Sequence, residues 1–541
     1  MKVQQLYSNN LISFCSKNKQ QQIAGNQNHT TSKVNTTIEY MSIPAKAFIG
    51  NISFTKKSNA KEKKTLDYNI FSLNQYKYNK NGPIVKYMAY SQDPLVNNQP
   101  EIFSIKGLVS PGPVNTRFKV IDDNSSPATS DTDGNFICDK DSASFDRVNA
   151  FVIANNTLNM YEKALGRDIK WAFDENQLIL RTRAGEGCCA NYHRGEKNIK
   201  LFYFPHINNL EETVYTARMA DLISHEVGHA IFDSLRPINI GWGKDGRSIH
   251  EGFADITAML LALWNDNLLD SAIKETNGDL KKDNVISLFA EQYGNAKLGT
   301  NCLRNMNNKL TMSTFSPGKE LKEEHNYGQL LGGTFYEIIV ECANKNAKYS
   351  SLKKALQQTR NDLTKVFIKA AGDYSPESHV YFSDIALAVL TADKINNNGK
   401  YFNEIKNVFI KRELLTPEQI NKWVQEQKSL PTLHIHNKNI ESEKTIEEFI
   451  NNNLNNLNLS LNNKYELYNS YTNDYGEVFL SFRALQQFKP GDREYEPDDD
   501  LGGVIYSPRT YDILKVAFDS NGKLIFKSTA RNKTIEIIYN D

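Results

Sequence analysis

His225 and His229 are the residues of this sequence best placed to do chemistry. In a helix, residues four apart project from one face about a turn from each other, so both imidazoles could bind one metal ion. Glu226 follows the first histidine and could take a proton from a water molecule at that metal. The alternative is that both histidines are hydrogen-bonded residues of a protein core.

The residues around the two histidines predict a helix over 213–235. The segment ends just before Pro237, a residue that often follows a helix end. Apolar residues recur in it at helical spacing: Ala220, Ile223, Val227, Ile231 and Leu235. We therefore expect the two histidines in the middle of a half-buried helix.

A second segment, residues 250–255, could complete a metal site. Catalytic zinc has three protein ligands and keeps one position open for water, whereas structural zinc usually has four. Glu251 follows His229 by 22 residues and is a candidate third ligand. His250 competes with it, because adjacent helical residues point about 100° apart and cannot easily share one metal ion. Asp255, one turn further on, could accept a hydrogen bond from a ligand histidine, which favours Glu251 as the ligand.

At these residues the sequence resembles the thermolysin-like zinc peptidases, the gluzincins, whose third zinc ligand is a glutamate of the following helix. Three further stretches resemble the family in the family's own order: residues 188–192, 302–307 and 325–336. The resemblance covers roughly residues 100–430. It implies an α+β fold with a two-lobed thermolysin-like peptidase core, in which a mixed β/α N-lobe and a helical C-lobe flank the active cleft.

The resemblance also implies an activity, zinc-dependent endopeptidase. One catalytic zinc ion would be bound by His225, His229 and Glu251. Glu226 would act as the general base, and His325 would donate a hydrogen bond to the oxyanion of the transition state. On the residues alone, His325 could instead be a solvated loop histidine, because two glutamates precede it.

Further residues are assigned to substrate by the same resemblance. Ala190 would lie on an edge strand that pairs with the substrate backbone, and Arg304 would bind a substrate carbonyl. Leu222 and Leu303 would line an apolar pocket, which implies cleavage before Leu, Ile, Val or Phe. Asp255 would hydrogen-bond a zinc-binding histidine and fix its tautomer. The expected partner is therefore an extended polypeptide.

The sequence departs from the family at three positions near the site. The family has asparagine where this chain has Cys189 and His250. The family's second oxyanion donor is a tyrosine between the last zinc histidine and the zinc glutamate, an interval in which this chain has none. Trp242 occupies the matching offset, and its indole N–H could donate a hydrogen bond.

Calcium is a second cation that the resemblance raises. Asp221, Asp270 and Glu275 match acidic positions of the family's calcium cluster. Ala262 and Ala272 stand where two further carboxylates belong, although Asp266 could replace one of them. Since calcium needs about six to eight oxygen ligands, we expect at most one weakly held Ca²⁺.

Composition excludes some classes of function. A net charge of +1 and a pI near 7.6 argue against a general binder of nucleic acids or membrane surfaces. No apolar run approaches the roughly 18 residues of a membrane span. The amino terminus lacks a secretory signal, so we expect a cytoplasmic protein or one exported by a signal-independent route. Adjacent Cys188 and Cys189 could form a disulfide, but the plainer expectation is two free thiols.

With 541 residues, the chain exceeds a single core and should form several units. We expect an Asn/Lys-rich, partly disordered region over 1–95, the N-lobe with the zinc-binding helix over 96–245, the helical C-lobe over 246–440 and a β-rich accessory domain over 464–541. An Asn-rich segment, 451–463, would separate the last two. In the N-lobe, a helix should run from Ser144 as N-cap to Gly166, and strands are expected at 169–173, 177–182 and 199–204. Helices in the C-lobe are expected near 250–265, 327–345, 351–371, 381–395, 401–413 and 417–428.

Two classes of function remain open. The first is a zinc endopeptidase acting on polypeptide, and the alternative is a non-catalytic or exported effector-type binding protein on a metallopeptidase scaffold. The intact Glu226 favours the enzyme. His434 and His436 would face one side of a strand and could also bind metal, but no third ligand accompanies them in the sequence.

Overall fold

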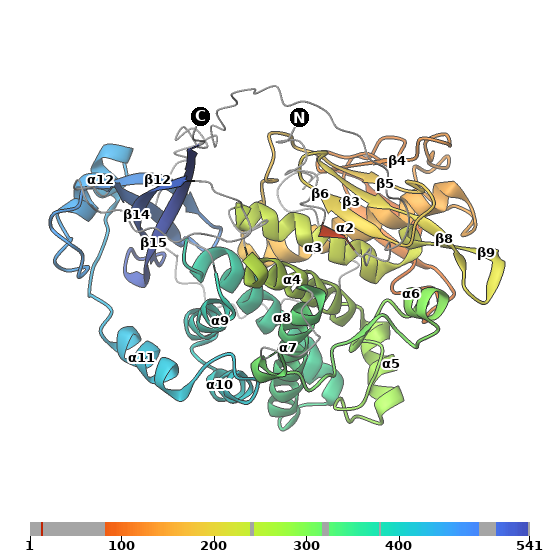
Figure 1. Ribbon diagram of the computed structural model, residues 1–541. Coiled ribbons are helices and arrows are strands. Elements are labelled where there is room, and N and C mark those ends of the chain that lie inside the picture. Colours follow the sequence, from red (N-terminus) through yellow and green to blue (C-terminus); the bar gives the residue numbers. More distant parts are fainter. Residues whose placement is uncertain are drawn as a thin grey trace, which may run out of the picture.

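Short strands dominate the amino-terminal part of the protein (Figure 1). The computed structural model describes residues 12–13, 82–237, 243–315, 324–377, 380–485 and 505–538. Five strands form one mixed sheet in the order β1-β6-β7-β5-β4. These strands are β1 (Ile12–Ser13), β4 (Phe118–Ile121), β5 (Leu178–Arg181), β6 (Ala190–His193) and β7 (Asn198–Leu201). β4, β5 and β7 run parallel, whereas β6 is antiparallel to both of its neighbours.

Two hairpins and a long helix complete this part of the chain. The hairpins pair β2 (Ile84–Ala89) with β3 (Glu101–Lys106) and β8 (Tyr203–His206) with β9 (Asn209–Tyr215). Helix α2 (Ala143–Leu165) begins at Ser142, whose side chain accepts the N–H of Phe145, and ends at Gly166 with φ 71°. The predicted end at Gly166 is confirmed, but Ser142 is the N-cap in place of Ser144.

Helix α3 (Ala220–Leu235) carries the two histidines and is shorter than predicted. The helix predicted to begin at 213 begins instead at 220, because residues 209–215 form β9 and pair with β8. Thr213, Val214 and Tyr215 are β-branched or aromatic and favour the strand.

Residues 169–173, predicted as a strand, form none. Side chains form the hydrogen bonds to this backbone that a neighbouring strand would otherwise make. The N–H of Ile169 donates to the carboxylate of Glu162, and its carbonyl accepts from Arg117. The predicted strand at 177–182 is present as β5, while the one at 199–204 is divided between β7 and β8.

Helices make up most of the region from 243 to 428 and agree closely with the predicted positions. The predicted helices correspond to α4 (Gly243–Leu263), α7 (Glu324–Ala347), α8 (Leu352–Lys369), α9 (Phe382–Asn397), α10 (Phe402–Lys411) and α11 (Pro417–Lys428). The structure adds α5 (Asp266–Thr276), short α6 (Glu291–Tyr293) and the two-residue strands β10 (Leu288–Phe289) and β11 (Arg304–Asn305). Thr416 caps α11, and Pro417 occupies its first position as predicted.

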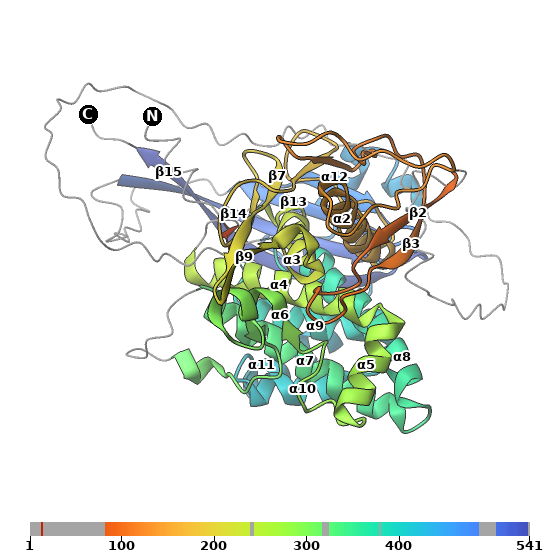
Figure 2. The same ribbon diagram turned by 90° about the vertical axis from the view of Figure 1, so that its right-hand side faces the viewer.

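Close packing of α4 against both α3 and α7 positions the site, with α3 and α4 between the sheets and the other helices (Figure 2). A Cβ atom on Gly228 of α3 would lie 2.9 Å from Thr257 Oγ1 of α4. A Cβ atom on Gly328 of α7 would lie 2.7 Å from Glu251 Cβ. Both separations are shorter than side chains tolerate, so these two glycines allow three helix backbones to meet at one place.

Strands β12 (Tyr465–Thr472), β13 (Val478–Leu485), β14 (Ile505–Phe518) and β15 (Leu524–Ile538) form a carboxy-terminal antiparallel sheet. Val478, Leu480 and Phe482 pack into a second core with helix α12 (Glu443–Asn451). Phe479 points to the opposite face, into the main core, where it stacks on Tyr471. Both faces of this sheet are therefore buried, and β14 and β15 extend beyond the other two strands as a hairpin (Figure 2).

The Asn-rich segment expected as a separating join contributes to this second core. Leu454 and Leu457 within it are buried there. Asn521 and Gly522 form the turn between β14 and β15, and Gly522 has a φ of 81°. Among the described residues, none of the helices has the length and apolar character needed to cross a membrane.

Buried ion pairs hold the carboxy-terminal sheet against the helices. Lys515 of β14 is 1% exposed and lies 2.9 Å from Glu377, and it donates to the carbonyl of Gly372. Burial would raise the pKa of Glu377, but the neighbouring cations Lys515 and Arg236 outweigh it and lower that pKa. Lys369 of α8 contacts Glu477 in the same region. Charged contacts thus complement the apolar ones across this interface.

Lys515→Met should destabilise the protein, because it removes the cation that pairs with the largely buried Glu377. Removing one partner of a buried pair typically costs about 3 kcal/mol or more. Exposed Lys523, on the β14–β15 turn, provides the matched control Lys523→Met. Urea unfolding of both variants measures the difference, and equal stabilities would contradict the proposed importance of the ion pair.

Candidate metal centre

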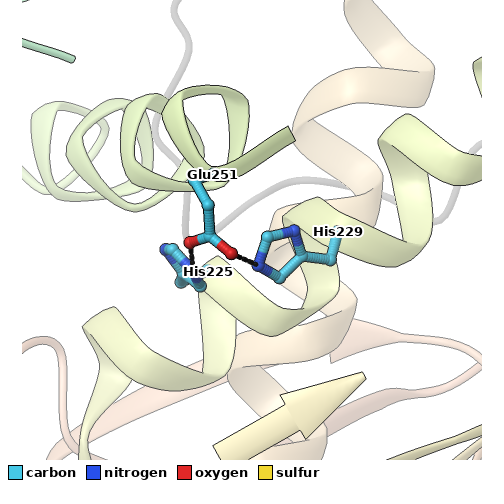
Figure 3. A group of neighbouring side chains, drawn as sticks. All are labelled: His225, His229 and Glu251. Carbon is cyan, nitrogen blue, oxygen red and sulfur yellow. Dashed lines mark ion pairs between the residues drawn. The ribbon is translucent and has the colours of Figure 1, made fainter. Parts of the chain in front are cut away.

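Helices α3 and α4 bring two imidazoles and one carboxylate together in the interior. His225 Nε2 lies 3.4 Å from Glu251 Oε2, and His229 Nε2 lies 3.6 Å from Glu251 Oε1. Figure 3 shows the carboxylate of Glu251 between the two rings. One ligand atom from each residue lies within 4.8 Å of the other two, and all three side chains are buried. Within the described parts of the chain, this is the one such group that could hold a metal ion.

The outer nitrogen of His225 faces a carboxylate. His225 Nδ1 lies 2.9 Å from Asp255 Oδ1, one helical turn after Glu251. Arg304 of β11 donates to the same oxygen at 2.7 Å, and its guanidinium lies over the ring of Phe289. A proton on Nδ1, the nitrogen that faces Asp255, would leave the Nε2 lone pair of His225 directed toward the ligand group. The structure therefore places Asp255 where the sequence predicted a contact to a ligand histidine.

The outer nitrogen of His229 faces a second imidazole. His229 Nδ1 lies 2.6 Å from Nδ1 of His250, and both rings are buried. Burial lowers the pKa of His250 to about 3 and holds the pKa of His229 well below its ordinary value. Both rings are therefore neutral at neutral pH, the form in which histidine binds a metal. The structure groups Glu251, and not the competing candidate His250, with the two predicted ligand histidines.

The carboxylate of Glu251 is flanked by three histidines. Besides the two on α3, His325 in the first turn of α7 places its Nε2 3.4 Å from Glu251 Oε2. Burial would raise the pKa of Glu251, but the electrostatic and hydrogen-bonding interactions with His325, His229 and His225 outweigh it, so this pKa lies well below its usual value. Glu251 is thus ionised, as a metal ligand must be. His325, whose side chain is 20% exposed, lies beside the ligand group.

Other predicted residues surround this group. Glu226 is fully buried on α3, next to the first ligand. Leu222 is fully buried one turn before Glu226, and Leu303 is partly buried against the main core. Arg304, predicted to bind a substrate carbonyl, forms an ion pair with Asp255, and Asp255 in turn faces His225. Their roles toward a substrate remain predictions.

The predicted substrate strand is β6. Ala190 pairs with Leu201 of β7 on one side of it. On its other side, the backbone of β1 pairs antiparallel with Asn191 and Tyr192. β6 is therefore an inner strand of the described sheet and not the predicted edge strand, because β1 occupies the side away from β7. Cys188 and Cys189, just before β6, form no disulfide in the described structure, in agreement with the simpler of the two expectations.

Trp242, considered as an oxyanion donor, lies outside the described residues. The sequence did not predict the contact between His229 and His250. The only sign of this contact in the sequence is that His250 directly precedes Glu251. On a helix, the side chains of two adjacent residues point about 100° apart.

The acidic residues considered for calcium have protein partners. Asp270 pairs with Lys353 at 2.6 Å, and Asp266 pairs with Arg360 at 2.7 Å. Asp221 accepts the N–H of Ala290, and burial raises the pKa of Asp221 to about 7. Glu275 accepts the N–H of Val285. None of these carboxylates belongs to the described group that could hold a metal ion.

Comparison with known proteins does not supply a family. No protein-family model matches the chain, and no curated protein is significantly similar to it. A function has to be inferred from the residues of the site and their geometry.

The metal group gives a direct prediction. The wild-type protein should bind about one metal ion per chain, and Glu251→Ala should lose it because one ligand is removed. Asp255→Ala should retain the ligands but weaken metal affinity roughly 10- to 100-fold, since it releases the ring of His225. Asp270→Ala, at an exposed position of α5, is the control. Metal content after dialysis is the measurement, and full occupancy in Glu251→Ala would refute this ligand group.

Proposed function

We propose that the protein is a zinc-dependent endopeptidase. The observation that carries this proposal is the buried group of His225, His229 and Glu251, with Glu226 next to it on the same helix. Two imidazoles and one carboxylate are a donor set used for catalytic zinc, and three protein ligands leave a position open for water. The ionised state of Glu251 and the neutral state of His229 suit that metal.

The chemistry of the reaction follows from these side chains. Zinc, when bound, would polarise the peptide carbonyl and lower the pKa of a bound water toward about 7. Glu226 would accept the proton from that water and deliver it to the leaving amine. His325 would donate a hydrogen bond where the oxyanion develops, since its ring already lies beside Glu251. Asp255 would keep the ring of His225 oriented during these steps.

An extended polypeptide is the substrate that the surroundings favour. β1 pairs with β6 on the side away from β7, so an extended substrate that binds to β6 would take the place of β1 there. Leu222 and Leu303 belong to the main apolar core, in which Leu303 is only partly buried. A substrate held along β6 would present its backbone to the site.

A non-catalytic binding protein on the same scaffold is the alternative. Such a protein would need the ligand group for stability but would have no use for a base at position 226. The intact Glu226 in the interior therefore favours the enzyme. Digestion of a peptide library, with and without a chelator, separates the two, because a zinc-loaded protein that cleaves nothing would be the binding protein.

Glu226→Gln should separate binding from chemistry. The substitution keeps the size of the side chain but removes the base, so zinc and peptide binding should persist while turnover falls roughly 100-fold or more. Zinc content and peptide affinity serve as controls beside the rate of cleavage. Cleavage at the wild-type rate would exclude Glu226 as the base.

His325→Ala should lower turnover more than it weakens peptide binding. The proposed hydrogen bond strengthens only when the oxyanion forms, so its loss should lower kcat by roughly 10- to 1000-fold with little change in ground-state affinity. His434→Ala, at an exposed position far along the chain, is the matched control. Near-normal kcat in His325→Ala would remove this histidine from the mechanism.

Cleavage should fall before Leu, Ile, Val or Phe. An apolar pocket lined by Leu222 and Leu303, as the resemblance implies, would accept these side chains and would discriminate between them by only about 1 to 3 kcal/mol per methylene. Mass spectrometry of the digested library gives the cut sites. Cuts beside charged residues in the majority of products would contradict the assigned pocket.

A further inference from the structure

The contact between His229 and His250 constrains where their protons lie. The two Nδ1 atoms are 2.6 Å apart, which is hydrogen-bond distance, so one of them must donate and the other must accept. His229 directs its Nε2 toward Glu251 and the ligand group. When that nitrogen uses its lone pair for a metal, the proton of the neutral ring is on Nδ1. His250 is then the acceptor.

We propose that His250 is a positioning residue of the metal centre, which accepts the Nδ1–H of His229 and so fixes the tautomer and orientation of that ligand. This inference rests on the proposed zinc site and adds a residue to it. Because Nδ1 of His250 accepts, the proton of its own ring is on Nε2. One short contact thus sets the tautomers of both rings.

The surroundings of His250 hold its ring in place. Its side chain is 1% exposed, and its ring lies edge-on to Phe232 at 5.0 Å between centroids. It directly precedes Glu251 on α4, so consecutive residues of one helix provide a metal ligand and the support for another ligand. The roughly 100° between adjacent helical side chains directs one to the metal group and the other to the back of His229.

The two ligand histidines are therefore held in different ways. Nδ1 of His225 faces the carboxylate of Asp255, whereas Nδ1 of His229 faces the ring of His250. An imidazole in this place orients the ring of His229 without adding a further buried carboxylate. This matters because Glu251 and Asp255 already place two buried carboxylates at this site.

Substitutions that differ only in the ability to accept a hydrogen bond test this role. His250→Leu and His250→Phe fill the space but accept none, whereas the amide oxygen of His250→Asn can accept from Nδ1–H of His229. Phe232→Leu is the packing control, because it alters the neighbour of His250 without removing the hydrogen bond. The measurement is affinity for zinc alone, by competition with a chromophoric chelator, together with the melting temperature of each variant.

We expect His250→Leu and His250→Phe to bind zinc roughly 10- to 100-fold more weakly, and His250→Asn to remain within about threefold of wild type. Phe232→Leu should lower the melting temperature without this loss of affinity. Wild-type zinc affinity in His250→Leu, or the same loss in His250→Asn as in His250→Leu, would overturn the proposal. If His250→Leu does not fold, the zinc affinities of His250→Phe and His250→Asn provide the same comparison. Since no substrate is used, a protein that shows the expected zinc affinities but cleaves no peptide would refute the endopeptidase and leave the role of His250 intact.

Discussion

The close approach of α4 to α3 and α7 is the constraint on which the site depends. Gly228 and Gly328 leave no side chain at the two points where the helices meet. Any larger residue at Gly228 would move α4 away from α3 and separate Glu251 from the two histidines. The ligand group therefore depends on two residues that bind nothing, and its geometry is set by backbone packing before any metal is considered.

The ionisable side chains of this packed interior have partners close by. Three histidines surround Glu251, and Asp255 lies between His225 and Arg304. Burying ionisable groups is costly unless each has a partner, and here the partners come from three helices and the short strand β11. The same contacts that reduce the cost of burial also orient the rings, so stability and metal binding use one network.

Part of this arrangement could be predicted from sequence. The metal ligands could be predicted, because their spacing is fixed within helices and both helices have clear apolar periodicity. The helices after residue 243 could be predicted for the same reason. The start of α3 could not, since residues 213–215 have helical neighbours but pair with β8. The contact of His250 with His229 depends on the rotation of α4 against α3, and no local pattern encodes such a rotation. The lobed arrangement of the thermolysin-like family is likewise a matter of how elements pack, and it stays a prediction, whereas the mixed α and β character is confirmed.

The carboxy-terminal sheet has a consequence for how the protein forms in the cell. Asp474 and Tyr475, between β12 and β13, hydrogen-bond to the backbone at the end of α2, more than 300 residues earlier. Phe479 and Phe526 fill places in the main core. During synthesis, α2 and the metal-binding helices leave the ribosome long before these strands exist. The nascent chain therefore leaves part of this core uncovered until the segment that contains Phe526 has been translated. The core is completed only when the carboxy-terminal strands join it, rather than domain by domain.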